Sequence, residues 1–418
     1  MSLTATAEIL LACAKKLDQY AATEGLTWDS KLETRRLSEE AIEMRDQMVD
    51  AAQGLQARLL GSWGTLFELV STLQFHDTQC VRAIVHFNVP ANVPDEGISF
   101  HELAAKVNLE ESVLTRLVRL AMMSRIFHEP RPGIVDHTTL SKSLATPNIF
   151  DAVNAFTEEL HPALFHVVAS LEKWPVSQEP NHTGWNLAQN TNDPFFPYLA
   201  KHPDRARRAA GLFHGLAKHA LTGPTDFTSS ALWRALDAPG NVLVDVGGGM
   251  GQISQELATI TKDLAFVVED LPDTCAFGEK ELPAQFCDRI TFRPHDFFTE
   301  QPVSGADAYF MRMIMHDWPD KYCIKILQNI VPALKDGARV VCCEVVLPEA
   351  ANPSFTEKKI RRMDLSMLAV HNATERTETQ WRSLFAQVDP RFKVEFESWP
   401  HAVYGLVIAT WNAQGANL

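Results

Sequence analysis

The feature that most constrains this chain is the stretch from Asn241 to Ser254, where an apolar run ends in Asp245 and a cluster of glycines follows. Apolar residues bounded by glycine are typical of a buried strand, and the Gln-Ile-Ser-Gln-Glu-Leu-Ala sequence after the cluster is typical of a helix. The glycines at 247, 248, 249 and 251 allow positive φ and a close approach to a ligand. The stretch therefore predicts a strand, a tight turn and a helix whose unpaired N–H groups meet a nucleotide-like ligand.

Spacing separates three ligand classes at such a turn. A phosphate loop would end in Gly-Lys-Ser/Thr, which does not occur here. A dinucleotide fingerprint would need a third glycine where Gln252 stands. The remaining pattern, acid-x-Gly-x-Gly-x-Gly, resembles the first motif of S-adenosylmethionine (SAM)-dependent methyltransferases. That resemblance implies that Asp245, Gly247 and Gly249 bind the cofactor SAM, whereas a turn with only a structural role is the alternative.

Composition excludes several other classes of function. The 418 residues predict two or three domains, and 46% hydrophobic residues suffice for real cores. The net charge of −14, from 38 basic and 52 acidic residues, argues against nucleic acid or an anionic membrane as the main partner. No apolar run approaches transmembrane length and no basic leader precedes one, so we expect a cytoplasmic protein. Seven cysteines without paired spacing predict reduced thiols and no metal site.

The first part of the chain predicts helices with a separate packing role. Residues 1–60 show apolar positions at helical spacing and predict an N-terminal helical arm. In residues 61–150, Ser99 and Glu102 form a capping box before one short helix, a second helix follows, and residues 125–138 predict a two-stranded wing. This order resembles a winged helix-turn-helix. Because the chain is acidic, we favour a dimerisation domain, and hence a homodimer, over DNA binding.

Residues 151–235 predict a helical connector that lines a substrate pocket. Six prolines between Pro162 and Pro203 divide it into short helices, with the aromatic residue Phe195 among them. The helix expected over residues 204–221 has an apolar side that includes Phe213 and Leu216. These side chains either form core or contact an apolar substrate.

Residues 236–418 predict an α/β domain, because strands alternate with helices. In an open parallel sheet, ligands bind beyond the carboxyl ends of the strands. The second strand ends in Glu269 and Asp270, and we expect Asp270 to bind the ribose hydroxyls of the cofactor. Asp296 and Phe297 follow the third strand, where they would accept from an adenine amino group and cover its ring. Seven strands are expected, at 241–246, 264–268, 289–293, 306–311, 338–346, 392–398 and 404–411.

Five motifs in this order make the resemblance specific. They are Val-Asp-Val-Gly-Gly-Gly-x-Gly, Asp-Leu-Pro, His-Asp-Phe-Phe, His316-Asp-Trp-Pro-Asp and Glu344-Val-Val-Leu-Pro-Glu. Together they resemble the plant phenolic and fungal secondary-metabolite O-methyltransferases. The resemblance implies a Rossmann-like, seven-stranded SAM-binding domain preceded by an all-α, winged-helix-type dimerisation domain.

The same resemblance implies the catalytic residues. In that family a histidine is the general base and two acids orient it, which assigns the base to His316 and the acids to Glu344 and Glu375. Arg312 stands where the family often has a lysine near the cofactor. A neutral imidazole removes a hydroxyl proton near pH 7, so the chemistry agrees with methylation of a hydroxyl on an aromatic or polyketide-derived metabolite.

One departure keeps two other functions open. The family commonly has a methionine against the acceptor ring in the helix before the cofactor domain, and residues 204–221 contain none. Some fungal relatives are pericyclases or dehydrating cyclases that use bound SAM as a fixed charge. His137, His295 and Arg293 would be the polarising groups in that case. A non-catalytic SAM-binding dimer is the third possibility, and the intact set of His316 and its two acids favours the methyltransferase.

Overall fold

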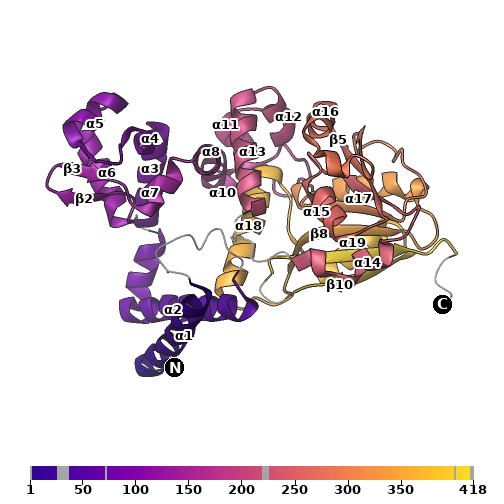
Figure 1. Cartoon of the computed structure of the whole chain (residues 1–418), viewed down its shortest axis with the longest axis horizontal. Helices are drawn as coiled ribbons and strands as arrows, with labels where there is room; N and C mark the ends of the chain where they lie inside the picture. Colours follow the sequence, from indigo (N-terminus) through magenta and orange to yellow (C-terminus); the bar gives the residue numbers. More distant parts are fainter. Residues whose placement is uncertain (1, 26–36, 71–72, 219–225, 400–401, 415–418) are drawn as a thin grey trace. The chain divides into compact units, whose positions relative to one another are not determined.

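The computed structural model describes residues 2–25, 37–70, 73–218, 226–399 and 402–414. The chain divides into two compact units, shown in Figure 1. The N-terminal unit comprises residues 1–166 and 184–221, and the sheet unit comprises residues 167–183 and 222–418. None of the helices within the described segments has the length and apolarity needed to cross a membrane.

The N-terminal unit begins with two long helices. Helix α1 (Leu3–Glu24) starts at Ser2, whose side chain accepts from the Ala5 N–H, and it packs against α2 (Glu39–Val70) through residues such as Cys13 and Leu17. Helix α2 is broken by a kink at Gly61, where φ is 66°. Its second half carries a row of exposed large apolar side chains, namely Leu59, Leu60, Trp63, Leu66, Phe67, Leu69 and Val70.

The next elements share one small core. The predicted capping box is present, because Ser99 and Glu102 bond reciprocally at the start of α5. A three-stranded sheet in the order β1-β3-β2 accompanies the helices, so the two helices and the hairpin occur where the sequence predicts them. The elements are α3 (Leu73–His86), α4 (Val89–Asn92), β1 (Ile98–Ser99), α5 (Phe100–Val107), α6 (Glu111–Met123), β2 (His128–Arg131) and β3 (Ile134–Asp136).

Short helices complete the N-terminal unit, as the prolines of this region predict. They are α7 (Thr139–Leu144), α8 (Pro147–Ala155), the π-helix η2 (Phe156–Leu160), α9 (His161–Phe165), α11 (Gly184–Gln189), α12 (Phe195–Ala200) and α13 (Pro203–Lys218). Helix α13 packs along α8. Glu159 of η2 is buried and accepts bonds from Arg205 and from the Trp185 indole.

The sheet unit is built on one large mixed sheet. Its strands run in the order β10-β11-β8-β7-β4-β5-β6, and a two-residue strand, β9, pairs with the end of β8. Strand β11 is antiparallel to both neighbours, and the strands from β8 to β6 are parallel. All seven strands predicted from the sequence occur: β4 (Val242–Val246), β5 (Ala265–Asp270), β6 (Ile290–Pro294), β7 (Ala308–Arg312), β8 (Arg339–Leu347), β10 (Phe392–Glu397) and β11 (Tyr404–Trp411); β9 spans Arg376–Thr377.

Alternation along the strands divides the core into two layers. On β8, Val341 and Cys343 belong to one cluster of buried residues and Cys342 to the other, because successive side chains of a strand point to opposite faces. The first cluster includes residues of α14 (Ala231–Leu236), α15 (Gln252–Ile260) and α18 (Phe355–His371); the second includes residues of α17 (Asp320–Ile330) and α19 (Glu378–Val388). The other helices of this unit are α10 (Val167–Lys173) and α16 (Pro272–Glu281).

The sheet topology fixes where a ligand can bind. Strand β4 pairs in parallel with β5 on one side and with β7 on the other, so the strand order reverses beside β4. In open α/β sheets ligands bind outside the carboxyl ends of strands at such a point. The glycine cluster follows β4 and His316 follows β7, and both therefore lie at this edge.

Candidate active site

The glycine turn after β4 is tightly packed. Gly247, Gly249 and Gly251 have φ of 71°, 59° and 74°, and the N–H groups of residues 247 and 248 donate to the Glu269 carbonyl at 2.8 and 3.0 Å. A Cβ atom on Gly248 would lie 2.6 Å from Cγ of Asp245, and one on Gly247 would lie 2.7 Å from Cδ1 of Ile314. Glycine is thus required here by close packing as well as by positive φ.

The two predicted acids of this edge have different surroundings. Asp245 is 2% exposed and its Oδ2 accepts from the Ser254 hydroxyl at 2.6 Å; burial raises its pKa to about 6. Asp270 is partly exposed, and its Oδ2 accepts the Gly249 N–H at 2.9 Å. Its neighbour Glu269 is buried against Gln301. Of the carboxylates at the end of β5, Asp270 is therefore the one that a bound molecule can reach.

Three further predicted cofactor residues lie at the same edge. The Arg312 guanidinium stands 5.7 Å from the centre of the Tyr404 ring, and its buried Nε has no acceptor among the described residues. Asp296 is exposed and its Oδ1 accepts the Phe298 N–H at 2.9 Å. Phe297 packs edge-on against Trp318, with ring centres 6.1 Å apart. Since a nucleoside cofactor with an amino-acid carboxylate needs a hydroxyl acceptor, an aromatic cover and a cationic donor, this set fits SAM.

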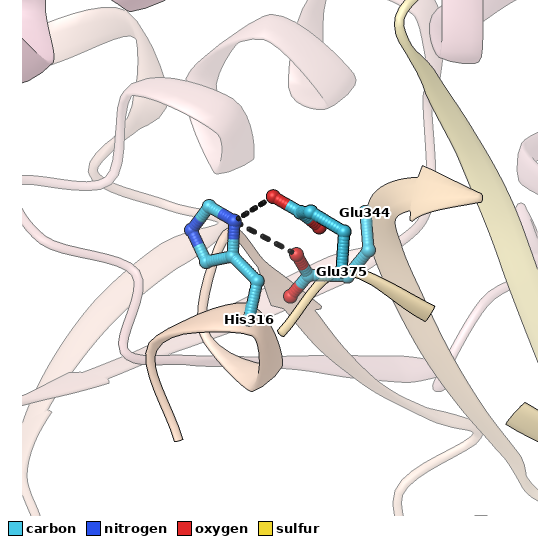
Figure 2. Close-up of side chains that lie close together, drawn as sticks. All are labelled: His316, Glu344 and Glu375. Carbon is cyan, nitrogen blue, oxygen red and sulfur yellow. Dashed lines mark hydrogen bonds and ion pairs between the residues drawn. The ribbon is translucent and has the colours of Figure 1, made fainter. Parts of the chain in front are cut away.

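A buried cluster surrounds His316, which lies on the 3-10 turn Met315–Asp317 directly after β7. Figure 2 shows Glu344, from β8, and Glu375, just before β9, on the same side of the ring. The His316 Nδ1 lies 2.8 Å from Oε1 of Glu375 and 3.8 Å from Oε2 of Glu344. The other ring nitrogen, Nε2, points away from both of these acids.

Hydrogen bonds fix the tautomer and the turn. An ionised carboxylate is only an acceptor, so Nδ1–H donates to Glu375 and Nε2 is the nitrogen that can take up a proton. Glu344 is fully buried, and its Oε1 accepts the N–H groups of Ile314 and Met315 at 2.8 Å each. The same carboxylate thus holds the turn and faces the ring that the turn carries.

Charge around the ring makes His316 a strong base. Burial alone lowers the pKa of this imidazole, but the carboxylates of Glu375, Glu344 and Asp317 outweigh that effect and raise it to about 10. Burial also raises the pKa of Glu344 and brings that of Asp317 to about 7. The imidazolium is therefore the favoured form of His316 near neutral pH.

Sequence reasoning missed two members of this cluster. Asp317 Oδ1 lies 3.7 Å from Nε2 of His316 and 3.4 Å from Nε2 of His371, a buried residue at the end of α18. Burial lowers the pKa of His371 to about 3, so this second imidazole is neutral. Asp317 belongs to the recognised His316 motif and could have been named. For His371 the only signal was its position four residues before Glu375.

The same three residues also have the geometry of a possible metal site. One ligand atom from each of His316, Glu344 and Glu375 lies within 4.8 Å of the others, close enough to hold an ion. However, Nδ1 of His316 already donates to Glu375 at 2.8 Å, and a metal would need that nitrogen without its proton. The arrangement is thus explained by a carboxylate-oriented base.

The predicted substrate residues are distributed over both units. In the N-terminal unit Phe195 is buried against Trp185, with ring centres 5.2 Å apart, and Phe213 is 42% exposed. Both ring nitrogens of His137 are bonded inside that unit, to Ser141 Oγ at 2.8 Å and to the Val93 carbonyl at 2.9 Å. The side chain of Leu216 lies outside the described residues. His295 follows β6 in the sheet unit, where its N–H donates to the Asp270 carbonyl and burial lowers its pKa.

The fold and the site together define a class of protein. A mostly parallel sheet carries a glycine turn, an acid and an arginine whose buried Nε has no acceptor among the described residues at its switch point, and a carboxylate-backed histidine follows the adjoining strand. These features define a SAM-dependent methyltransferase with a Rossmann-like domain. Residues 219–389 match the O-methyltransferase domain family.

Sequence comparison identifies the family. The chain is 36% identical to the chlorophenol O-methyltransferase of Trichoderma longibrachiatum over 93% of this chain and 85% of that one. It is also 36% identical to O-methyltransferase AMT9 of Alternaria alternata, over 88% and 86% of the two chains. The chain belongs to the fungal O-methyltransferase family, and it is a SAM-dependent O-methyltransferase.

Solved structures share the fold over the whole chain. OxaC in complex with S-adenosylhomocysteine (SAH) and oxaline superposes with a TM-score of 0.78 at 20% identity, covering 98% of this chain and 99% of that one. LepI C52A in complex with SAH and a substrate analogue superposes with a TM-score of 0.75 at 24% identity, covering 97% and 100%. A further match is described as a pericyclic reaction enzyme, with a TM-score of 0.73 at 24% identity and 97% and 100% coverage.

Proposed function

We propose that the enzyme methylates a hydroxyl group of an aromatic or polyketide-derived secondary metabolite, with His316 as the general base. The observation that carries the proposal is the 2.8 Å bond from Nδ1 of His316 to Glu375, because it leaves Nε2 to accept a proton. Glu344 adds negative charge on the same side of the ring at 3.8 Å. Both acids stabilise the imidazolium that proton uptake creates.

The residues of the sheet unit suggest how the reactants are held. We assign the ribose hydroxyls of SAM to Asp270, the adenine to Asp296 and Phe297, and the cofactor carboxylate to Arg312, and the turn that includes Gly247 and Gly249 would also contact the cofactor. Asp245 is buried beneath that turn and accepts a hydrogen bond from the hydroxyl of Ser254 on α15, which helps to hold the turn in place. SAM supplies an electrophilic methyl group. His316 Nε2 takes the hydroxyl proton as the oxygen becomes nucleophilic, and orientation of the acceptor accounts for much of the rate.

The names of two relatives support this acceptor class. One relative is a chlorophenol O-methyltransferase, and another, from Cladonia grayi, is the O-methyltransferase of the grayanic acid biosynthesis cluster, 35% identical over 80% of this chain and 71% of that one. A phenolic hydroxyl is a weak acid, so a base positioned beside it is needed to take up its proton as the oxygen becomes nucleophilic.

A pericyclic or dehydrating cyclisation is the second candidate. The fold likeness to the structure described as a pericyclic reaction enzyme favours it, and Arg293 lies in β6 with His295 directly after the strand. His137 fits this role less well because both of its ring nitrogens are already bonded. The intact base cluster around His316 favours methylation.

One experiment separates the two functions. The purified enzyme is incubated with SAM and with phenolic or polyketide fractions, and mass spectrometry follows product and SAH. Methylation gives a product heavier by one methylene and one SAH for each product. An isomeric or dehydrated product formed without SAH would establish the cyclase instead and overturn this proposal.

We propose a homodimer formed through the N-terminal helices. The exposed row on α2, including Trp63, Leu66 and Phe67, is a larger apolar stripe than scattered surface residues usually make, and a second copy would cover it. Light scattering should give about twice 46.7 kDa for the chain. Trp63→Asp together with Phe67→Asp should give the monomer, and an unchanged mass in this double variant would contradict the assignment of the interface.

We also propose boundaries for three regions of the chain. We assign residues 1–60 to the arm, 61–150 to the dimerisation domain and 151–235 to the connector, with Phe195 and Phe213 as its candidate substrate-contacting residues. The cytosol is the proposed location. In its support, each of the seven cysteines is a free thiol, as expected in a reducing compartment.

A further inference from the structure

The turn that carries His316 is held from two sides by buried side chains. On one side, Glu344 accepts the N–H groups of Ile314 and Met315. On the other side lies Arg376, the first residue of β9, which is 1% exposed. Its Nη1 donates to the Met315 carbonyl at 3.0 Å and its Nη2 to the Trp318 carbonyl at 3.0 Å. These two carbonyls bracket His316 and Asp317.

The guanidinium is itself fixed in place. Its Nε and Nη2 donate to Oδ1 of Asp320 at 2.9 and 2.7 Å, and Nη2 lies 3.3 Å from Sγ of Cys323. The plane stands 5.4 Å from the centre of the Trp381 ring. Burial opposes the charged form, yet neighbouring negative groups, Asp320 and Glu344 among them, keep the pKa of Arg376 above its ordinary value. Arg376 is therefore a permanent buried cation with a single geometry.

The backbone of Arg376 connects the same guanidinium to both acids of the base. Arg376 directly follows Glu375, and it pairs with Val346 of β8, two residues after Glu344. Arg376 thus connects the turn that carries His316 to β8, which contains Glu344, and to the segment that ends in Glu375. The 2.8 Å distance between His316 Nδ1 and Oε1 of Glu375 depends on the relative position of the His316 turn and the segment that precedes β9.

We infer that Arg376 is a positioning residue for the methyl transfer: its planar guanidinium sets the turn at His316 so that the ring stays bonded to Glu375. This inference rests on the proposed function of His316. A lysine cannot replace it, because one ammonium group does not serve two separated carbonyls and a carboxylate in a fixed plane. A displacement of about 1 Å at a reacting group can cost on the order of a hundredfold in rate.

The test compares Arg376→Lys and Arg376→Met with Arg382→Met. Arg382 lies on α19, with a side chain 54% exposed, and bonds the Val394 carbonyl away from the base. We expect kcat for each SAM-binding site to fall by about 10–100-fold in both Arg376 variants, with the KM for SAM within about twofold. The control should keep the wild-type kcat. Active sites are counted by SAH titration, so partial unfolding does not count as lost rate.

A second readout follows the ring without turnover. Selectively labelled histidine allows NMR titration of His316 in SAH-bound enzyme, identified by its loss in His316→Ala. If Arg376 positions the ring, Arg376→Lys, which keeps the positive charge, lowers the pKa of His316, because the contact with Glu375 loosens. Arg376→Met also removes a positive charge, which acts on this pKa in the opposite direction, so that variant is compared by its kcat alone. Asp320→Asn, at a half-exposed partner, should lower kcat by a smaller amount and serves if the Arg376 variants do not fold.

The outcomes separate this inference from the proposed function. Wild-type enzyme that forms no SAH with any acceptor would overturn the proposed function, whereas the NMR titration would still test Arg376. Unchanged kcat per site and an unchanged His316 titration in Arg376→Lys, even with a lower melting temperature, would show that Arg376 is only structural. For the surface variant Asp320→Asn an unchanged kcat per site would also overturn the inference.

Discussion

The glycine turn and the base cluster lie at the same edge of the sheet but are built in opposite ways. The turn is one continuous stretch, held by backbone bonds to the Glu269 carbonyl and by packing that excludes a Cβ atom. The base cluster gathers His316, Glu344 and Glu375 from three separate segments through buried charges. We propose that the first binds the cofactor and that the second accepts a proton, so substitutions in the two regions should change different constants.

The largest expected effect is at the base. His316→Ala removes the imidazole whose Nε2, as we propose, takes up the acceptor proton, and turnover should fall by about 10²–10⁴. SAM affinity should stay nearly unchanged, because the imidazole addresses the acceptor and not the cofactor. Calorimetric titration with SAM and initial rates of SAH formation measure the two constants. A wild-type rate in this variant would remove the proposed base.

The complementary substitution lies at the end of β5. Asp270→Ala removes a carboxylate that accepts the Gly249 N–H at 2.9 Å and, as we propose, the ribose hydroxyls. A charge-assisted hydrogen bond is worth about 1.5–3 kcal/mol, so SAM affinity should fall by roughly 10–150-fold. At saturating SAM the turnover should approach that of the wild type. The reverse pattern, with affinity kept and turnover lost, would break the separation of the two regions.

A third substitution tests packing within the turn. Gly248→Ala would place a Cβ atom 2.6 Å from Asp245 Cγ, and overpacking of this kind costs about 1–3 kcal/mol of stability. Thermal unfolding should therefore occur several degrees lower, with weaker SAM binding. Gly54→Ala on α2 is a suitable control, because the φ of Gly54 is not positive and the nearest atom to its Cβ position is Nη2 of Arg58 at 3.5 Å, an ordinary contact. Equal losses in both variants would contradict a specific role of the Asp245 contact.

The same contrast explains how much of the fold the sequence could predict. Seven of the eight strands described in the sheet unit were predictable, because buried apolar runs and glycine boundaries are local signals. The capping box at Ser99 was predictable for the same reason. The kink at Gly61 in α2 was not, since one glycine inside a helical pattern does not reveal its φ. The short strand β9 gives no periodic signal with two residues, yet it places Glu375 beside β8.

For the site, local motifs identified residues but not their environment. The resemblance named His316, Glu344 and Glu375, and the structure brings them within hydrogen-bonding or ion-pair distance. The sequence could not show that Asp245 is buried under the turn while Asp270 stays accessible, because Asp245 is the last residue but one of an apolar strand and Asp270 is the last residue of another. The sequence also could not show that His371 packs near Asp317, since that contact depends on how the end of α18 packs against the Met315–Asp317 turn. The roles of these residues remain predictions until tested.

The smallest expected effect concerns the second acid of the base cluster. Glu344→Gln can keep an oxygen for the N–H groups of Ile314 and Met315 while it removes a negative charge 3.8 Å from the His316 ring. That charge is one of those that raise the pKa of His316 to about 10, so the variant should have a lower value. Because the neutral imidazole is the active form, kcat/KM rises with pH through this pKa, and the rising limb of the profile should move to lower pH.

The shift of the pH profile to lower pH reflects two opposing effects of a lower His316 pKa on the rate. A weaker base lowers the plateau at high pH, whereas the larger neutral fraction offsets the loss near neutral pH. Glu395→Gln, an exposed acid on β10, serves as the matched control and should leave the profile in place. A rising limb that stays fixed in Glu344→Gln, or moves to higher pH, would mean that the charge of Glu344 does not act on His316 and that its two backbone bonds are its whole contribution to the cluster.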